Sequence, residues 1–331
     1  MKGIRINGTG LYVPKTIATN EDFTKIIETN DEWITTRTGI KQRHIANGEP
    51  AWYLGAQAAK QAVENAKISV DEISIIIFTT VTSDFATPSA ACVVQRELGV
   101  PATCMAFDLN AACSGFVYAV DTARALLSAD ENKKYALVIS AECLSKFVDY
   151  SDRASCILFG DGAAAAVISL SDTMYTSHVG ADGTGAGFLF ARSYENECPF
   201  NDGTITVDDK MPPSNGHFLA QDGHEVYKFA VKAMPNAVFA ACEKAKIDVS
   251  DIDLVIPHQA NVRIIKAATK TLGLSEDKVF VNIENYGNTS SATIPIALHE
   301  AITQGRLKRG DKVCLVGFGA GLTYGAVIFE Y

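Results

Sequence analysis

Short apolar runs rich in β-branched residues alternate along the chain with longer, alanine-rich stretches that have helical spacing. In the first part of the chain this pattern predicts strands at 73–80, 105–109 and 135–140, and helices at 89–98 and 114–128. Strands that alternate with helices in this way are typical of an α/β domain whose sheet is largely buried.

An internal repeat divides the chain. Residues 62–73 and 241–252 share Ala, Glu, Ala, Lys, Ile, Val and Ile at matching positions. Each copy continues through a strand (74–80 or 253–257), a helix, a second strand (104–109 or 279–283), an Asn-containing turn, a further helix and a strand that ends in glycines. The recurrence predicts two duplicated halves, 1–172 and 173–331, with a loop-rich insertion at 180–217 and a site at their junction.

Composition excludes several classes of protein. The 331 residues are 47% hydrophobic, and 29 Lys and Arg against 38 Asp and Glu give a net charge of −9, which disfavours nucleic-acid binding. The N-terminus lacks a secretory signal and every apolar run is strand-sized, so we expect a cytoplasmic protein without a membrane span. Eight cysteines without a Cys-x-x-Cys spacing predict reduced, buried thiols and no metal site.

Cys113 stands apart from the other cysteines because it lies between an apolar strand and a predicted helix. A thiol at a helix N-terminus faces the positive end of the helix dipole, which favours the thiolate. Cys92, Cys242 and Cys314 lie within predicted elements among apolar neighbours, where a buried, inert thiol is the simpler interpretation. Cys113 is therefore the candidate nucleophile.

Two further polar residues follow apolar strands of the second half. His258 comes directly after a predicted strand that ends at Pro257, where an imidazole could donate a hydrogen bond or exchange a proton, although a surface or capping histidine is the alternative. Asn288 occupies roughly the position that corresponds to Cys113, although a turn or N-cap asparagine is the alternative. The glycines of 317–321 permit a close backbone approach to a reacting oxygen.

Three cations follow His258 at helical spacing. Arg263, Lys266 and Lys270 fall on one face of a predicted helix. A solvated helix face is the usual reason for such a pattern. In a chain of net charge −9, the stripe is also a candidate docking patch for an acidic partner.

Taken together, these residues resemble the β-ketoacyl-acyl carrier protein synthase III family of the thiolase superfamily. The motifs that carry the resemblance are Trp33-Ile-Thr-Thr-Arg-Thr-Gly-Ile40, Asn110-Ala-Ala-Cys-Ser-Gly-Phe116, Asp152-Arg153, Leu158-Phe-Gly-Asp-Gly-Ala163, Pro257-His-Gln-Ala-Asn261, Tyr286-Gly-Asn-Thr-Ser290 and Gly317-Phe-Gly-Ala-Gly321. The resemblance implies a thiolase-like, five-layer αβαβα fold made of two duplicated halves, and a homodimer. It implies an acyltransferase that condenses a short acyl-CoA primer with malonyl-acyl carrier protein, with loss of carbon dioxide, to start fatty-acid synthesis.

Site residues follow from the same resemblance. It implies a catalytic triad of Cys113, His258 and Asn288, with the backbone N–H groups of Cys113 and Ala320 as the oxyanion hole. Trp33 and Arg153 would flank the adenine of CoA. The full set of implied CoA contacts is Trp33, Arg37, Thr38, Arg153, Asn261 and Phe318, and the implied carrier-protein contacts are Arg263, Lys266 and Lys270. No cofactor or metal is implied.

Departures from the family pattern keep alternatives open. Ala320 stands where a glycine is usual, and Ala86-Thr87 precede Pro88-Ser89 where many relatives carry Phe, so the primer is open and a longer or branched acyl group is one hypothesis. The alternatives are a related condensing or acyl-transferring enzyme of secondary metabolism and a catalytically silent binding homologue. A cysteine hydrolase is a more distant possibility, because no carboxylate motif would orient the histidine.

Overall fold

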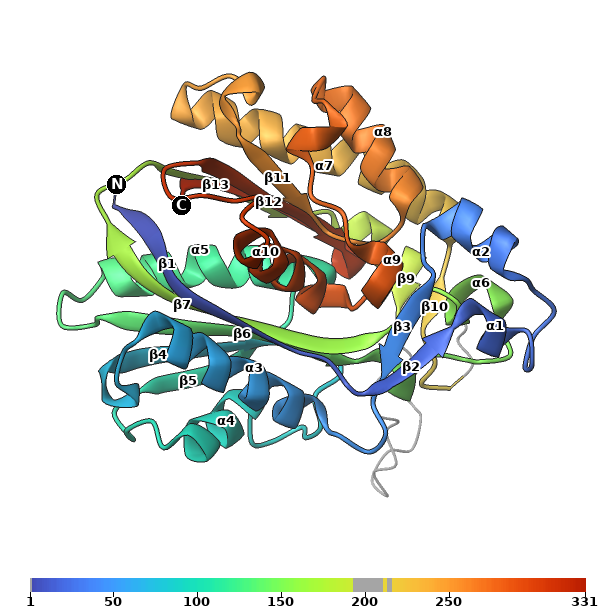
Figure 1. Cartoon of the computed structure of the whole chain (residues 1–331), viewed down its shortest axis with the longest axis horizontal. Coiled ribbons are helices and arrows are strands. Elements are labelled where there is room, and N and C mark those ends of the chain that lie inside the picture. The colour runs from blue at the N-terminus through green and yellow to red at the C-terminus, as the bar shows by residue number, and fades with distance from the viewer. Residues whose placement is uncertain (1, 193–210, 213–215) are drawn as a thin grey trace, which may run out of the picture.

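Two sheets with the same strand order form the framework of the protein. The structure is a computed structural model that describes residues 2–192, 211–212 and 216–331. The first sheet has the order β1-β7-β6-β4-β5. The second, read in the matching direction, has the order β8-β13-β12-β11 (Figure 1). Their strands are β1 (Gly3–Tyr12), β4 (Ile73–Thr79), β5 (Met105–Leu109), β6 (Tyr135–Cys143), β7 (Asp161–Ser171), β8 (Tyr175–Ala181), β11 (Leu254–Pro257), β12 (Lys312–Gly319) and β13 (Thr323–Glu330). Residues up to 171 supply the whole first sheet, and residues from 175 onward supply the second.

Strand directions repeat as well. In each sheet the strand before the first long helix pairs antiparallel with the last strand of that half, as β1 does with β7 and β8 with β13. The corresponding pairs β4–β6 and β11–β12 are parallel. Next to β11, a single parallel bridge between Val255 and Val279 stands where the first sheet has β5.

The prediction of a strand at 279–283 is wrong after Val279, the residue that forms this bridge. After Val279 the backbone bonds to the side chain of Gln259. The Gln259 NH₂ group donates to the Phe280 carbonyl, and the Gln259 side-chain oxygen accepts the Asn282 N–H. At Ile283 the chain already begins the short helix α9 (Ile283–Tyr286).

Helices cover both faces of both sheets. Apolar residues of α5 (Gly115–Ser128) and α10 (Thr293–Thr303) pack in one core with residues of both sheets, so these two helices form the central layer (Figure 1). The outer face of the first sheet packs against α3 (Ala51–Ala66) and α4 (Ala90–Leu98). The outer face of the second packs against α7 (Gly223–Ala245) and α8 (Val262–Leu272). The predicted five-layer αβαβα fold is confirmed.

A segment of the first half, residues 16–45, lies beside this core, and we call it the lip. It contains β2 (Thr16–Thr19), α1 (Asn20–Phe23), α2 (Asp31–Thr38) and β3 (Gln42–Ile45), and α6 (Arg153–Cys156) lies nearby (Figure 1). The short pair β9 (Leu189–Phe190) and β10 (Ala220–Gln221) lies at the same end. Most of the insertion predicted at 180–217 lies outside the described residues.

The cysteine prediction is confirmed for most of the described cysteines. All seven of these thiols are free and six are buried, but Cys92 is exposed on α4 and was wrongly predicted to be buried. Cys198 lies outside the described residues. Across the described ranges, no cluster of His, Cys, Asp and Glu could hold a metal ion. Nor does any described helix combine the length and the apolar character needed to cross a membrane.

Candidate active site

Cys113 lies at a sharp turn between β5 and the central helix α5. The preceding residue, Ala112, adopts a left-handed conformation with φ 46°, and Ala112–Ser114 form a 3-10 turn that leads into the helix. Because non-glycine residues rarely adopt this conformation, the turn is a specific feature of the site. The Cys113 side chain is 8% exposed and lines a cavity of about 820 Å³, together with Ala320, Ser290 and apolar residues that include Phe159.

The surroundings of the Cys113 thiol favour its protonated form, whereas its position at a helix N-terminus predicted the thiolate. Burial raises the pKa of Cys113 to about 12, while its hydrogen bond to the Ser290 hydroxyl, with Sγ 3.4 Å from Oγ, acts in the opposite direction. Burial is the larger effect, so the Cys113 thiol is protonated at neutral pH. The thiolate that we expected from the helix N-terminus is therefore not the resting form.

The turn before α10 repeats the turn before α5. Ser290 has φ 50° and begins a 3-10 turn, as Ala112 does. The Asn288 side-chain oxygen accepts the Ser290 N–H at 2.8 Å, and the Asn110 oxygen accepts the Ala112 N–H at 3.2 Å. Structurally, Asn288 therefore corresponds to Asn110 and Ser291 to Cys113. This corrects the sequence-based match of Asn288 with Cys113.

The same hydrogen bond fixes the orientation of the Asn288 amide. Only the amide oxygen can accept the Ser290 N–H, so the Asn288 NH₂ group is directed away from this turn. Backbone hydrogen bonds with Leu158 and Gly160 hold Asn288 against the first half. Asn288 is thus a rigid hydrogen-bond donor next to Ser290.

His258 follows β11, as predicted, and is only 1% exposed. Its Nδ1 lies 2.6 Å from the Thr293 hydroxyl, and its ring packs edge to face on Phe318 with centroids 5.3 Å apart. Burial lowers the pKa of His258 to about 3, so the imidazole is neutral. A Cβ placed on Gly317 would lie 3.6 Å from the Cys113 carbonyl oxygen and 3.7 Å from the His258 Cβ, so both residues adjoin Gly317 near the end of β12.

Glycine at position 319 allows the closest backbone approach in the site. A Cβ on Gly319 would lie 2.6 Å from the Cys113 backbone nitrogen, closer than real Cβ contacts allow. The following residue, Ala320, lines the same cavity as Cys113. The chain after β12 therefore lies directly against the nucleophile turn.

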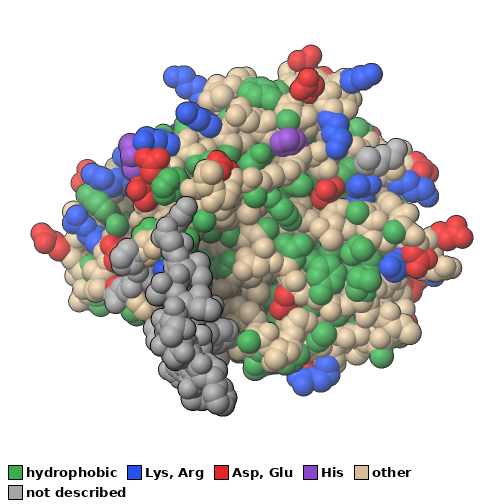
Figure 2. Space-filling model, turned by 180° about the vertical axis from the view of Figure 1, so that it is seen from behind, with side chains coloured by type: hydrophobic (Ala, Val, Ile, Leu, Met, Phe, Trp, Pro, Cys, Tyr) green, Lys and Arg blue, Asp and Glu red, His purple; other side chains and the backbone are tan. Residues whose placement is uncertain are grey.

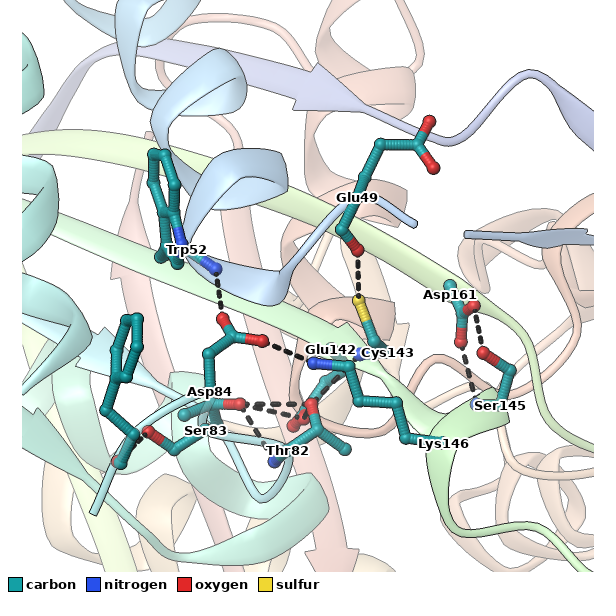
Figure 3. A network of polar contacts seen from close by, with 12 residues as sticks. Glu49, Trp52, Thr82, Ser83, Asp84, Glu142, Cys143, Ser145, Lys146 and Asp161 are labelled. Atoms are coloured by element: carbon teal, nitrogen blue, oxygen red, sulfur yellow. Dashed lines mark hydrogen bonds and ion pairs between the residues drawn. The ribbon is translucent and has the colours of Figure 1, made fainter. Parts of the chain in front are cut away.

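A buried carboxylate joins the two halves beneath this site. One oxygen of Glu142, at the end of β6, accepts hydrogen bonds from the Val81 N–H and from the hydroxyls of Thr80 and Thr82. The other accepts the Ser291 hydroxyl at 2.7 Å. Figure 3 shows Glu142 and Thr82 in this network. Sequence reasoning missed Glu142, because one acidic residue in an apolar strand carries no motif.

A second cavity, of about 690 Å³, lies at the lip. It is lined by Leu158, whereas the next residue, Phe159, lines the Cys113 cavity. Five of the six predicted CoA contacts line it with Arg263; the five are Trp33, Arg37, Thr38, Arg153 and Asn261. The guanidinium carbons of Arg37 and Arg153 lie 4.6 and 4.9 Å from the centroid of the Trp33 ring.

Thr38, Asn261 and Phe318, three of the predicted CoA contacts, bond to or pack against neighbouring parts of the fold. The Thr38 hydroxyl is buried and bonds to the backbone of Ile34 and Ile40. The Asn261 oxygen caps α8 by accepting the Arg263 N–H. Phe318 is buried against His258 and does not line this cavity. The aromatic and guanidinium groups are therefore the part of the set best suited to bind a nucleotide.

Buried Arg43 holds the lip in place. Its guanidinium donates to the Ala18 carbonyl, the Asn20 side-chain oxygen and the Ile157 carbonyl, and it lies over the Phe23 ring. These bonds connect the lip, which carries Trp33, to the segment that carries Arg153. The sequence offered no signal for this role.

The three predicted cations lie on the exposed face of α8. Arg263, Lys266 and Lys270 are exposed, whereas Ile264, Ile265, Ala268 and Leu272 face the core. The predicted helix face is therefore present, and its first cation, Arg263, lines the second cavity.

Comparisons with known proteins place these features in a family. Two family models match, the C-terminal part of 3-oxoacyl-[acyl-carrier-protein] synthase III at residues 242–331 and 3-oxoacyl-[acyl-carrier-protein] synthase III at residues 107–189. A β-ketoacyl-[acyl-carrier-protein] synthase III from Clostridium acetobutylicum is 46% identical, with 100% of this chain and 99% of that protein covered. The chain belongs to the β-ketoacyl-acyl carrier protein synthase III family.

Solved structures agree with this membership. The crystal structure of the Aquifex aeolicus 3-oxoacyl-[acyl-carrier-protein] synthase III is 44% identical and matches with a TM-score of 0.90 over 99% of this chain and 100% of that one. The synthase III structure from Thermus thermophilus is 40% identical, with a TM-score of 0.89 and 98% of both chains covered. This chain is therefore a condensing acyltransferase of fatty-acid synthesis, and the alternative in secondary metabolism is not favoured.

Proposed function

We propose that this enzyme condenses a short acyl-CoA primer with malonyl-acyl carrier protein to give 3-oxoacyl-acyl carrier protein. The observation that carries the proposal is the pair of cavities that are lined by the consecutive residues Leu158 and Phe159. One holds Cys113 at a helix N-terminus, and the other holds Trp33 with the guanidinium groups of Arg37 and Arg153 close to its ring. An adenine ring suits stacking with indole and guanidinium planes, and its phosphates suit the positive charge. Acyl-CoA would therefore span both cavities.

In the first half-reaction, Cys113 takes the acyl group. Its Sγ attacks the thioester carbon, the bond from that carbon to the CoA sulfur breaks, and the thiol proton leaves with CoA. The backbone N–H groups of Cys113 and Ala320 stabilise the oxyanion. The close approach of Gly319 to Cys113 supports this pairing.

In the second half-reaction, His258 and Asn288 act on malonyl-acyl carrier protein. Nε2–H of the neutral His258 ring and the Asn288 NH₂ group donate to the thioester oxygen. This stabilises the enolate as carbon dioxide leaves, and the enolate carbon attacks the acyl-enzyme and releases the Cys113 thiolate. The fixed Asn288 amide and the neutral His258 support these roles. No step requires a metal or cofactor.

Two partners belong to the proposal. The exposed cations Arg263, Lys266 and Lys270 would dock the acidic carrier protein. A second copy of the chain would form a homodimer, because β5 is an open edge of its sheet with Met105 exposed, and hydrophobic side chains gather on the back face of the molecule (Figure 2). The proposed substrates are cytoplasmic molecules, so we propose the same compartment for the enzyme.

Intact-mass measurement tests the first half-reaction. The full chain is incubated with a panel of acyl-CoAs from acetyl-CoA to longer and branched primers. We expect a mass increase of one acyl group, absent from Cys113→Ala and retained in Cys92→Ala, which removes the exposed free thiol. An unmodified wild type across the panel, or acylation that persists in Cys113→Ala, contradicts the proposal.

Replacement of Asn288 by Ala tests the second half-reaction. Acylation of Cys113 should persist while condensation falls, because Asn288 donates only to the malonyl thioester in this mechanism. Measuring both half-reactions on the same preparation separates the two steps. Equal loss of both would count against the role of Asn288.

A further inference from the structure

A neutral histidine can act as a donor at Nε2 only if Nδ1 carries no proton. In this protein the His258 ring is fully buried, and in the described part of the chain its single hydrogen bond joins Nδ1 to the Thr293 hydroxyl at 2.6 Å. Phe318 packs against the ring on another side. Thr293 is therefore the polar group that can select the tautomer of His258.

One hydrogen lies between the Thr293 hydroxyl oxygen and His258 Nδ1, and either atom can be its donor. If the hydroxyl donates to Nδ1, the proton of the neutral ring lies on Nε2. If Nδ1–H donates to the hydroxyl, Nε2 is an acceptor. The Thr293 hydroxyl also lies 3.1 Å from the Ser290 carbonyl, but that carbonyl already accepts the Thr293 backbone N–H. The hydroxyl proton is thus free to satisfy Nδ1 without leaving a buried carbonyl unpaired.

The repeated turns show that this hydroxyl is specific to the second half. Thr293 lies three residues after Ser290, and its counterpart three residues after Ala112 is Gly115. His258 corresponds to Thr79 in the internal repeat, and a Cβ on Gly115 would already lie 3.0 Å from the Thr79 Cβ. The turn can therefore form without a hydroxyl at the position of Thr293. The hydroxyl is present in the half in which the neighbouring residue is a histidine.

We propose that the Thr293 hydroxyl donates to Nδ1 of His258 and holds the neutral ring as its Nε2–H tautomer, which makes Thr293 a positioning residue for the condensation step. The inference rests on the proposed function, since the Nε2 proton is the one that His258 would donate to the malonyl thioester. Thr293 is 2% exposed at the first position of α10, so its side chain is fixed by the fold. It contacts no reacting atom and acts only through His258.

Nitrogen-15 NMR of the full chain with labelled histidine measures the tautomer directly. The His258 signals are assigned by their absence in His258→Asn. We expect wild type to carry the proton on Nε2, and Thr293→Val to show a mixture of tautomers, with Thr293→Ser close to wild type. A wild-type ring protonated on Nδ1, or an unchanged tautomer in Thr293→Val, overturns the proposal.

Kinetics provide the second measurement. In Thr293→Val, decarboxylation of malonyl-acyl carrier protein should fall about 10- to 100-fold, the worth of one hydrogen bond to a charged group, while Cys113 acylation changes less than about twofold. Thr293→Ser should restore the rate. Thr303→Val is the matched control, because that exposed hydroxyl at the end of α10 bonds only to carbonyls of its own helix.

The outcomes separate this inference from the proposed function. Parallel loss of acylation and decarboxylation in a folded Thr293→Val would overturn the positioning role. A wild type that performs neither half-reaction would contradict the proposed function, whereas NMR would still locate the proton. If Thr293→Val does not fold, the wild-type tautomer alone decides, because it requires no variant.

Discussion

Replacing Glu142 tests whether one buried carboxylate holds the two halves of the site together. Its two oxygens accept four hydrogen bonds, three from the first half and one from Ser291 of the second. Glu142→Ala removes the acceptor for all four donors, whereas Glu142→Gln keeps one oxygen and the shape of the side chain. The pair of variants therefore separates acceptor loss from charge loss.

The magnitude follows from which donors have another partner. The Thr80 and Thr82 hydroxyls lie 3.2 Å apart and can bond to each other, and the Ser291 hydroxyl also lies 3.2 Å from the Thr79 carbonyl. Because one bond between the two threonines uses only one of their protons, Glu142→Ala leaves the Val81 N–H and one hydroxyl proton unpaired, at a cost of about 1–3 kcal/mol each, and the cavity left by the side chain adds about 1 kcal/mol. We expect Glu142→Ala to lose at least about 3 kcal/mol of unfolding free energy.

Glu142→Gln should stay within about 1 kcal/mol of wild type. Its oxygen can accept the three donors of the first half, and its NH₂ group can donate to Ser291, whose hydroxyl then donates to the Thr79 carbonyl. Burial also raises the pKa of Glu142, so a neutral isostere avoids the cost of a buried charge.

Urea unfolding of the full chain, followed by fluorescence and circular dichroism, measures the difference. Acylation and condensation rates are measured on the same preparations. Because Ser291 adjoins Ser290, which contacts Cys113, Glu142→Ala should also slow condensation. The reasoning would be refuted if Glu142→Gln were as unstable as Glu142→Ala, or if Glu142→Ala matched wild type.

Three further predictions follow from the site. Arg153→Ala should raise KM for acyl-CoA roughly tenfold, because it removes a guanidinium from the face of an indole; an unchanged KM for acyl-CoA would contradict this. The rate of Cys113 alkylation should rise about tenfold per pH unit between about pH 7 and pH 9, because a thiol with a raised pKa gains thiolate throughout that range; a plateau near neutral pH would contradict it. Lys266→Glu combined with Lys270→Glu should raise KM for malonyl-acyl carrier protein at low salt and much less at high salt, with exposed Lys60→Glu on α3 as the control.

The sequence alone determined the fold class and the main chemical groups. Hydrophobic periodicity depends on local spacing, so the strands and helices around Cys113 fall within a few residues of their predicted ends. The internal repeat likewise predicted two duplicated halves, and the structure shows two sheets that share one strand order. Cys113 and His258 were identifiable because each follows an apolar strand.

Tertiary structure decided how those groups behave. The order of elements in the repeat matched Asn288 with Cys113, but the left-handed residues Ala112 and Ser290 show that Cys113 corresponds to Ser291. Cys113 and Ser290 are 177 positions apart, and no local pattern predicts a contact at that separation. The protonated thiol has the same origin, because burial depends on what packs around a group and not on its neighbours in sequence. The contact of Thr293 with His258 likewise exists only because α10 packs against the end of β11, and that of Glu142 with Ser291 only because the two halves fold against each other.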